Sequence, residues 1–315
     1  MKKGDDITGN DIISLSQFDK TTVQLILKRT DKILQLMKKN KCSDVLKGSV
    51  IALLFFEPST RTFNSFSSAA QRLGAGIISL RDLSMSSMVK GETLEDTTRI
   101  YSGYADAIVV RGPEQGTAQR VADAADVPVI NAGDGVGEHP TQTFLDLYTI
   151  QKKFGRLSSL RVAMVGDLLN GRTIHSLIRG LSYYPRNTVY LLAPKKLRLK
   201  KELIKEVGDR ITIVEIDSIR ELPTDMHVWY WTRIQKERFS SKQEYLKLKD
   251  SFILTPHVLK ERGNSKMIIM HPLPRVNEIP YEIDNDPRAY YFQQARNGLL
   301  VRMALLSLVL GKRMR

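Results

Sequence analysis

The sequence predicts an α/β protein made of two doubly wound domains, each a mostly parallel β-sheet flanked by helices. Three observations indicate this fold class. The chain has 315 residues, more than one compact core usually holds. Short apolar runs rich in β-branched residues alternate with segments of helical periodicity. These runs are apolar throughout, as expected of strands that are buried on both faces of a parallel sheet.

The expected strands fall into two series, one for each domain. The first series covers residues 50–56, 107–110 and 127–130, and the second covers residues 162–165, 189–192, 211–214, 227–230 and 267–270. A helix is expected from residue 60 to residue 73, because apolar residues recur there at helical spacing before Gly74. A second helical pattern, over residues 140–154, is expected to link the domains.

We expect residues 1–150 together with residues 292–315 to form the first domain, and residues 151–291 to form the second, with two helices joining them. The apolar stretch at residues 298–310 contains Arg302 and is shorter than the roughly 20 residues that cross a bilayer. It is therefore expected to be a buried helix. The first residues are polar where a signal peptide would be apolar, so the protein is expected in the cytoplasm, without a membrane partner.

Composition narrows the classes of partner. The net charge of +14 favours anionic partners, which include nucleic acid, an acidic protein and small anionic substrates. The charge is dispersed, and its densest run, at residues 195–205, lacks the interleaved aromatic side chains that stack on bases. We therefore do not expect a nucleic-acid partner. Cys42 is the only cysteine, which excludes an intrachain disulfide and a cysteine-based metal site.

The segment at residues 55–62 runs from a predicted buried strand into a helix N-terminus. Its hydroxyl groups, the free backbone N–H groups of the first helical turn and a guanidinium all suit a bound anion. They belong to Ser59, Thr60, Thr62 and Arg61. The alternative is that Ser59 or Thr60 merely caps the helix, which accounts for the hydroxyls but not for the arginine.

Two further polar segments follow in the first domain. Ser86 and Lys90 lie in a loop that could fold over an oxyanion, although an ordinary surface loop has the same composition. His139 and Gln142 follow the turn-rich residues 131–135 after a predicted strand, where ligands bind in open α/β sheets. Their side chains could polarise a carbonyl and hold an amide, whereas the alternative is a structural histidine at a helix start.

Polar segments also follow the predicted strands of the second domain. They contain Asp167 with Arg172, Arg233 with Gln235, and the proline-rich residues 271–275. The planar fork of donors on an arginine matches the carboxylates of a dicarboxylic acid. Surface ion pairs and a rigid turn are the alternatives.

Four motifs together resemble those of the aspartate carbamoyltransferase catalytic chain in residues, order and spacing. They are Phe56-Glu57-Pro58-Ser59-Thr60-Arg61-Thr62, Lys90-Gly91-Glu92-Thr93, His139-Pro140-Thr141-Gln142 and His271-Pro272-Leu273-Pro274-Arg275. The resemblance extends from about residue 13 to the C-terminus. It implies transfer of the carbamoyl group of carbamoyl phosphate to aspartate in de novo pyrimidine biosynthesis, without a metal, a cofactor or a covalent enzyme intermediate.

The resemblance also implies a role for each matching residue. Carbamoyl phosphate would be bound by Ser59, Thr60, Arg61, Thr62, Ser86, Lys90, Arg111, His139, Gln142, Leu273 and Pro274. Aspartate would be bound by Lys90, Arg172, Arg233 and Gln235. The residues expected to act in catalysis are Arg61, Thr62, Lys90, Arg111 and His139, and those expected to close the domains are Glu57, Arg172 and Arg238.

Within this scheme the donor has a defined orientation. Its carbonyl oxygen would be held by Thr62, Arg111 and His139, and its NH₂ group by Gln142 and the backbone carbonyls of Leu273 and Pro274. Ser86 and Lys90 would reach the site of a neighbouring subunit, which implies a homotrimer with shared sites. An acidic regulatory chain is a further possible partner of the basic surface.

The sequence leaves two alternative functions open, and it departs from the family pattern at several positions. A related carbamoyltransferase for ornithine typically has Cys at the position of Pro272 and lacks the pair Arg233 and Gln235. A basic nucleic-acid-binding protein on the same fold is the second alternative. The chain departs from the family pattern at Phe63-Asn64, Ser67, Val89, Gly112 and Leu169-Asn170. None of these departures removes a predicted catalytic group, but they bear on the family's loop contacts, trimer interfaces and allosteric behaviour.

Overall fold

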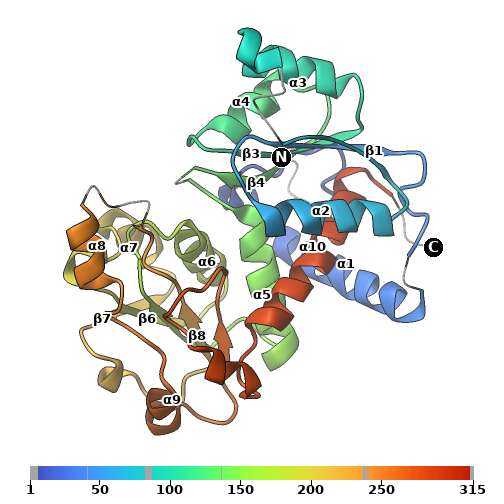
Figure 1. The fold of residues 1–315 in the computed structure, drawn as a ribbon. Helices are drawn as coiled ribbons and strands as arrows, with labels where there is room; N and C mark the ends of the chain where they lie inside the picture. The colour runs from blue at the N-terminus through green and yellow to red at the C-terminus, as the bar shows by residue number, and fades with distance from the viewer. Residues whose placement is uncertain are drawn as a thin grey trace. The chain divides into compact units, whose positions relative to one another are not determined.

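The computed structural model describes residues 6–40, 42–81, 87–135, 137–236, 239 and 241–312. The chain divides into unit 1, with Met1–Tyr148 and Arg296–Arg315, and unit 2, with Thr149–Ala295. Each unit contains one parallel sheet with helices around it (Figure 1), so the predicted fold class is confirmed. Both division points fall inside helices, the first in α5 (Pro140–Phe154) and the second in α10 (Tyr291–Val309).

Unit 1 contains a four-stranded sheet in the order β2-β1-β3-β4. Its strands are β1 (Val50–Phe55), β2 (Gly76–Leu80), β3 (Ala107–Gly112) and β4 (Val129–Asp134). All three pairings are parallel. The sequence did not predict β2, because this edge strand has no buried residue and therefore lacks the continuous apolar run of its neighbours.

The helical elements of unit 1 begin and end at recognisable signals. They are η1 (Leu15–Gln17), α1 (Lys20–Lys39), α2 (Thr60–Arg72), η3 (Ser87–Lys90), α3 (Leu94–Ser102) and α4 (Thr117–Ala124), together with the adjoining parts of α5 and α10. The Asp19 carboxylate caps α1 by accepting the backbone N–H of Thr22 at 2.8 Å. Helix α2 ends where predicted, because Gly74 adopts φ +83°, a conformation that favours glycine.

Unit 2 contains a five-stranded parallel sheet in the order β7-β6-β5-β8-β9. Its strands are β5 (Arg161–Val165), β6 (Thr188–Leu192), β7 (Thr212–Ile216), β8 (Val228–Trp231) and β9 (Ile268–Met270). The helical elements are α6 (Arg172–Ser182), η4 (Lys195–Leu197), α7 (Lys201–Val207), η5 (Ile219–Glu221), α8 (Lys242–Leu248), α9 (Pro256–Arg262) and η7 (Tyr281–Asn285). All five strands overlap the predicted runs.

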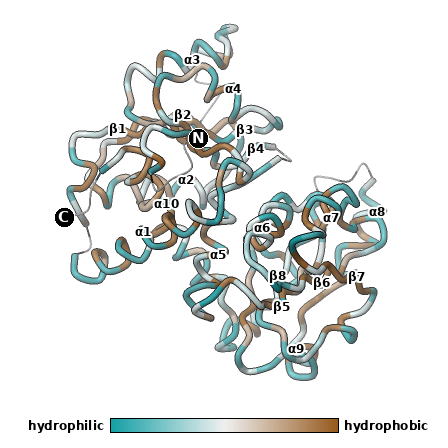
Figure 2. Tube along the Cα trace, turned by 180° about the vertical axis from the view of Figure 1, so that it is seen from behind, coloured by the Kyte–Doolittle hydropathy of each residue, from teal (hydrophilic) through white to brown (hydrophobic). Residues whose placement is uncertain are grey.

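Each sheet carries its own hydrophobic core. In unit 1, side chains of β1 and β3 pack with Ala118 and Val121 of α4. In unit 2, Trp229 and Trp231 of β8 are fully buried and pack against residues of β5 and β9. The strands are largely hydrophobic along the chain trace, whereas the loops and the outer turns of helices are largely hydrophilic (Figure 2). The strands therefore lie inside, as their continuous apolar runs predict.

Unit 2 also holds one buried histidine, His271, and one partly buried histidine, His175, through specific hydrogen bonds. His271 accepts the backbone N–H of Leu273 at Nδ1 (2.8 Å), so its Nε2 carries the proton that it shares with Glu278 Oε1 at 2.8 Å. Burial lowers the pKa of His271. Burial alone would raise the pKa of Glu278, but the interactions with His271 and the backbone hydrogen bonds together outweigh burial and keep that pKa below its usual value. Burial likewise lowers the pKa of His175, whose Nε2 bonds the Leu168 carbonyl at 2.8 Å.

We predict that the free energy of unfolding falls as the pH drops below about 6.5, the ordinary pKa of histidine. Below that pH the unfolded chain binds protons at His175 and His271 that the folded chain does not bind, so protonation favours unfolding. Urea unfolding at constant ionic strength between pH 7.5 and 5.5 measures the effect. Replacing His175 with Gln should flatten the slope, and a stability that stays constant or rises on acidification would contradict the prediction.

Candidate active site

In each sheet there is one position where the connections that follow two adjacent strands lead to opposite sides of the sheet. In unit 1 the chain leaves β1 toward β2 on one side and later fills β3 and β4 on the other. In unit 2 it fills β6 and β7 on one side of β5 and β8 and β9 on the other. Ligands of open α/β sheets bind beyond the carboxyl ends of the strands at such a switch point. Most of the predicted site residues lie at or after the carboxyl ends of β1, β3 and β4 in unit 1 and of β5, β8 and β9 in unit 2, whereas Ser86 and Lys90 follow β2.

The N-terminus of α2 lies directly after β1. Ser59 is the residue before the first helical turn, and its side chain makes no capping hydrogen bond with the described residues. The Ser59 side chain therefore does not cap α2. Thr60 and Arg61 are exposed in the first turn, whereas Thr62 is buried. A helix N-terminus with free amides, accessible hydroxyls and a guanidinium is a site for an anion.

Arg111 lies beside this helix start, because β3 pairs with β1 and Arg111 is the register partner of Phe55. Its Nη1 donates to the Ala132 carbonyl oxygen at 3.1 Å, and its Nη2 forms an ion pair with Glu57. The Arg111 side chain is 11% exposed and the Glu57 side chain 23%, so solvent screens this pair only partly. The family resemblance assigned Glu57 to domain closure and Arg111 to carbamoyl phosphate binding, and it did not predict the contact between them.

A network of hydrogen bonds fixes the loop that follows β4. The side-chain amide of Asn131 donates to the backbone oxygens of Ile13 (2.8 Å) and Glu138 (3.3 Å), and its oxygen accepts the N–H of Gly133 (2.7 Å). Glu138 in turn accepts the backbone N–H of Leu15 at 2.8 Å. This loop ends at His139, which is 5% exposed at the start of α5. The position of the imidazole is therefore set by the N-terminal segment as well as by β4.

Gln142 lies in the first turn of α5 and is also buried. Its Nε2 donates to Asp146 Oδ1 at 2.9 Å, one helical turn further along. The sequence did not indicate Asp146. It also did not indicate a role for Arg302 of α10, although a charge within an apolar helical stretch is a signal that could have identified it.

Two of the departures from the family pattern have a packing explanation. A Cβ on Gly112 would collide with the side chain of Thr117 at the start of α4. The absence of a side chain at Gly112 thus lets α4 approach β3 closely. Phe63 packs edge-to-face on Phe55, with ring centroids 5.3 Å apart, and lies under the Arg81 guanidinium at 4.1 Å. Nothing in the structure explains the departures at Asn64 and Ser67.

In unit 2, the carboxylate of Asp167 ties two loops of the predicted aspartate site together. It accepts the backbone N–H of Asn170 at 3.0 Å and also that of Gln235. Gln235 Nε2 donates to the Asn170 carbonyl oxygen at 3.2 Å. Burial raises the pKa of Asp167. Gly166, at φ +119°, allows this approach, because a Cβ there would collide with the carbonyl oxygen of Thr232.

Two predicted aspartate ligands flank this junction of loops. Arg172 is the first residue of α6, after β5, and Arg233 follows β8. The charge of Arg233 also contributes to the lowered pKa of His271, after β9. Arg172, Arg233 and Gln235 thus follow adjacent strands of one sheet, as the sequence predicts for a site of unit 2. Arg238, predicted to act in domain closure, lies outside the described residues.

The proline-rich turn after β9 is held from both ends. Leu273 has φ +53° and is joined to Pro274 by a cis peptide bond, and its N–H is bound by His271. Arg275 forms a two-pronged ion pair with Asp284 and donates to the Tyr291 hydroxyl at 3.0 Å. The backbone carbonyls of Leu273 and Pro274 therefore belong to a turn that its neighbours orient.

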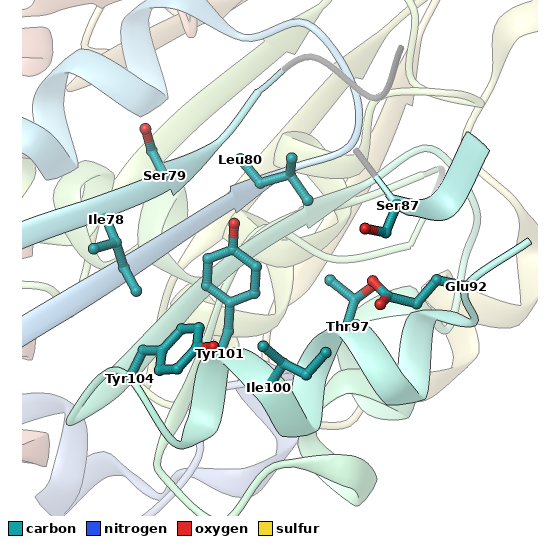
Figure 3. Close-up of a pocket in the computed structure, with 9 residues that line it drawn as sticks. All are labelled: Ile78, Ser79, Leu80, Ser87, Glu92, Thr97, Ile100, Tyr101 and Tyr104. Atoms are coloured by element: carbon teal, nitrogen blue, oxygen red, sulfur yellow. The ribbon is translucent and has the colours of Figure 1, made fainter. Parts of the chain in front are cut away.

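The last predicted segment is described only in part. Ser86 lies outside the described residues, and Lys90 is exposed at the end of η3. A pocket of about 580 Å³ opens between β2 and the segment at residues 87–104, as Figure 3 shows. Its lining includes Ile78, Leu80, Ser87, Glu92, Tyr101 and Tyr104. None of the predicted substrate-binding residues within the described part of the chain lines it.

No group of three or more His, Cys, Asp or Glu side chains in the described part of the chain could hold a metal ion. No described helix combines the length and the apolar character of a membrane span.

The sequence matches two family descriptions that together cover most of the chain. Residues 10–152 match the aspartate/ornithine carbamoyltransferase carbamoyl-P binding domain, and residues 158–309 match the Asp/Orn binding domain. The chain is 44% identical over 296 residues to the aspartate carbamoyltransferase catalytic subunit of Methanobrevibacter smithii, covering 94% of this chain and 93% of that protein. It is 46% identical over 306 residues to the multifunctional protein pyr1-3 of Dictyostelium discoideum, covering 97% of this chain but only 14% of that protein.

Solved structures show the same similarity. The catalytic subunit of Methanocaldococcus jannaschii aspartate transcarbamoylase superimposes with a TM-score of 0.90 at 44% identity, covering 96% of this chain and 98% of that chain. Aspartate transcarbamoylase from Trypanosoma cruzi in complex with carbamoyl phosphate and aspartate superimposes with a TM-score of 0.89 at 34% identity, covering 96% and 98%. The sequence motifs, the fold and the chain length match those of aspartate carbamoyltransferase catalytic subunits. The protein therefore belongs to the aspartate carbamoyltransferase family.

Proposed function

We propose that this chain is an aspartate carbamoyltransferase, which converts carbamoyl phosphate and L-aspartate into N-carbamoyl-L-aspartate and phosphate for de novo pyrimidine synthesis. The observation that carries the proposal is the pair of switch points, one with an anion-binding helix start and Arg111, the other with Arg172, Arg233 and Gln235. Residues 1–150 with 292–315 are proposed to bind carbamoyl phosphate, and residues 151–291 to bind aspartate.

The phosphate of the donor is proposed to bind at the start of α2. Ser59, Thr60, Arg61 and Thr62 would supply hydroxyls, backbone amides and one guanidinium, and Arg111 would supply a second guanidinium. Charge-assisted hydrogen bonds of this kind are roughly twice as strong as neutral ones. His139, Thr62 and Arg111 would hold the carbonyl oxygen, and Gln142 with the Leu273 and Pro274 carbonyls would hold the NH₂ group.

The reaction needs positioning and charge stabilisation more than covalent help from the protein. The neutral amine of aspartate attacks the carbamoyl carbon, a C–N bond forms, the C–O bond to phosphate breaks and the departing phosphate takes the amine proton. Donors aimed at the carbonyl oxygen stabilise the tetrahedral species by about 3–4 kcal/mol each. Holding the two reactants in line can supply roughly 7–11 kcal/mol more.

The ion pair between Glu57 and Arg111 supports an exchange of partners during binding. The incoming phosphate would displace Glu57 from Arg111, because a dianion compensates the guanidinium better than one carboxylate. Glu57 would then be available to pair with Arg172 and Arg238 and close the domains. This exchange would make carbamoyl phosphate bind before aspartate, since closure requires Glu57 to leave Arg111.

Shared sites in a homotrimer are part of the proposal. The segment that contains Lys90 also exposes the large apolar side chains of Val89, Ile100 and Tyr104, at 66%, 43% and 65%. Such side chains favour burial against another protein surface, and a second copy of the chain fits the predicted reach of Lys90 into a neighbouring site. An acidic regulatory chain and a cytoplasmic location stay predictions, and no nucleic-acid partner is proposed.

We expect the purified chain to form carbamoylaspartate from carbamoyl phosphate and aspartate, and no detectable citrulline when ornithine replaces aspartate. The second domain offers arginines, which bind a dicarboxylate and repel the cationic side chain of ornithine. Product formation by mass spectrometry with each amine offered separately is the measurement. Turnover of ornithine at a comparable rate would contradict the assignment of the acceptor.

We predict that Glu57→Gln raises the KM for aspartate at least roughly tenfold, about 1.4 kcal/mol, and lowers kcat, because the residue would no longer pair with arginines on closure. The KM for carbamoyl phosphate should not rise, because the competitor for Arg111 is removed. Steady-state kinetics test both expectations. Glu114→Gln, an exposed carboxylate in the loop after β3, is the matched control. Unchanged aspartate kinetics in Glu57→Gln would refute the exchange.

Mixing two inactive variants tests the shared site. Lys90→Ala and His139→Ala should each lose nearly all activity, because each removes a cationic or polarising group from every site. Trimers reassembled from both variants should regain up to roughly a quarter of the native sites, since some sites then combine an intact Lys90 with an intact His139. A Lys90→Ala, His139→Ala double variant mixed with either single variant is the control. Absence of recovery in mixed trimers would count against sharing.

A further inference from the structure

We propose that Asp146 and Arg302 are positioning residues that hold the Gln142 amide with its carbonyl oxygen toward the donor, so that the enzyme selects an acyl phosphate that carries an NH₂ group. The inference rests on the proposed function and deepens it by naming what sets donor specificity. All three residues belong to unit 1.

Asp146 decides which way the Gln142 amide points. The Asp146 side chain is fully buried, and its Oδ1 accepts from Gln142 Nε2 at 2.9 Å. An ionised carboxylate only accepts hydrogen bonds, so the amide must turn its NH₂ group toward Asp146. The Gln142 carbonyl oxygen then points away from Asp146. No hydrogen bond among the described residues uses that oxygen, so it can accept one from an NH₂ group.

A buried carboxylate needs a compensating charge to stay ionised. Arg302 supplies it from α10, where its side chain is 5% exposed. Burial and the charge of Arg111 lower the pKa of Arg302, the charge of Asp146 raises it, and the result of all three is a pKa of about 10. Arg302 is therefore still charged at neutral pH, and its attraction to the Asp146 carboxylate favours the ionised form of both groups.

The guanidinium of Arg302 is itself held in place. Its Nη1 donates to Ser65 Oγ at 2.8 Å, and its Cζ lies 5.2 Å from the centre of the Phe66 ring in α2. Gly298, one turn earlier in α10, provides the space, because a Cβ there would lie 2.8 Å from Nη1. The Nε of Arg302 is buried without a hydrogen-bond partner among the described residues. Keeping a cation in such a position is costly, which argues for a role beyond packing.

Asp146→Asn removes the constraint on Gln142, because an asparagine can donate as well as accept and so allows either orientation of the Gln142 amide. Acetyl phosphate is a suitable comparison donor, since it has the same phosphate and carbonyl groups but a methyl group in place of NH₂. We expect Asp146→Asn to lower kcat/KM for carbamoyl phosphate roughly 10- to 100-fold, and to change binding of acetyl phosphate by less than about threefold. Arg302→Met should act in the same direction, and Arg302→Lys, which keeps the charge, more weakly.

The experiment measures the dissociation constants of both acyl phosphates by calorimetry and the steady-state kinetics with aspartate, for the full-length wild-type chain and each variant. Asp134→Asn is the matched control, because Asp134 is a buried carboxylate of the same unit that caps α4 through the N–H groups of Gly116 and Ala118. It should affect both donors by the same factor. A folded Asp146→Asn chain that loses both donors equally, or neither, would overturn the proposal. A wild-type chain that makes no carbamoylaspartate would instead refute the proposed function.

Discussion

The parallel pairing of β1 with β3 is the constraint on which unit 1 depends. Because all strands of the sheet run in one direction, every loop that follows a strand emerges at the same edge. The reversal of strand order at β1 separates two of these loops and leaves room between them. The start of α2 and Arg111 are neighbours for that reason, although they lie far apart in the sequence. The same constraint brings the loops after β5 and β8 together in unit 2.

Sequence patterns predicted the parts of the fold that depend on local periodicity. The apolar run of β1, the helical spacing of α2 and the stop at Gly74 are all contained in one short segment, and the structure has each of them. The edge strand β2 escaped prediction, because one side of an edge strand has no neighbour and its residues are only partly buried. The motifs identified most of the candidate site residues through family resemblance, and the sheet topology explains why these residues gather.

Contacts between distant charges could not be predicted in the same way. The pairing of Glu57 with Arg111 depends on the register between two strands, which composition and spacing do not specify. The relation of Arg302 to α2 and α5 depends on how α10 packs, so the sequence revealed only an arginine inside an apolar stretch. In both cases the sequence showed the charged residue, but only the three-dimensional structure showed which residue it interacts with.

The ion pair at Arg111 determines how the site responds to small anions in the surrounding solution. A resting guanidinium that already holds a carboxylate gains little by exchanging it for chloride, bicarbonate or another monovalent ion, since the net charge at the site stays the same. A doubly charged ligand gains more than it displaces. If the phosphate of the donor binds at Arg111 as proposed, the site would therefore discriminate against abundant monovalent anions and still respond to a scarce dianion.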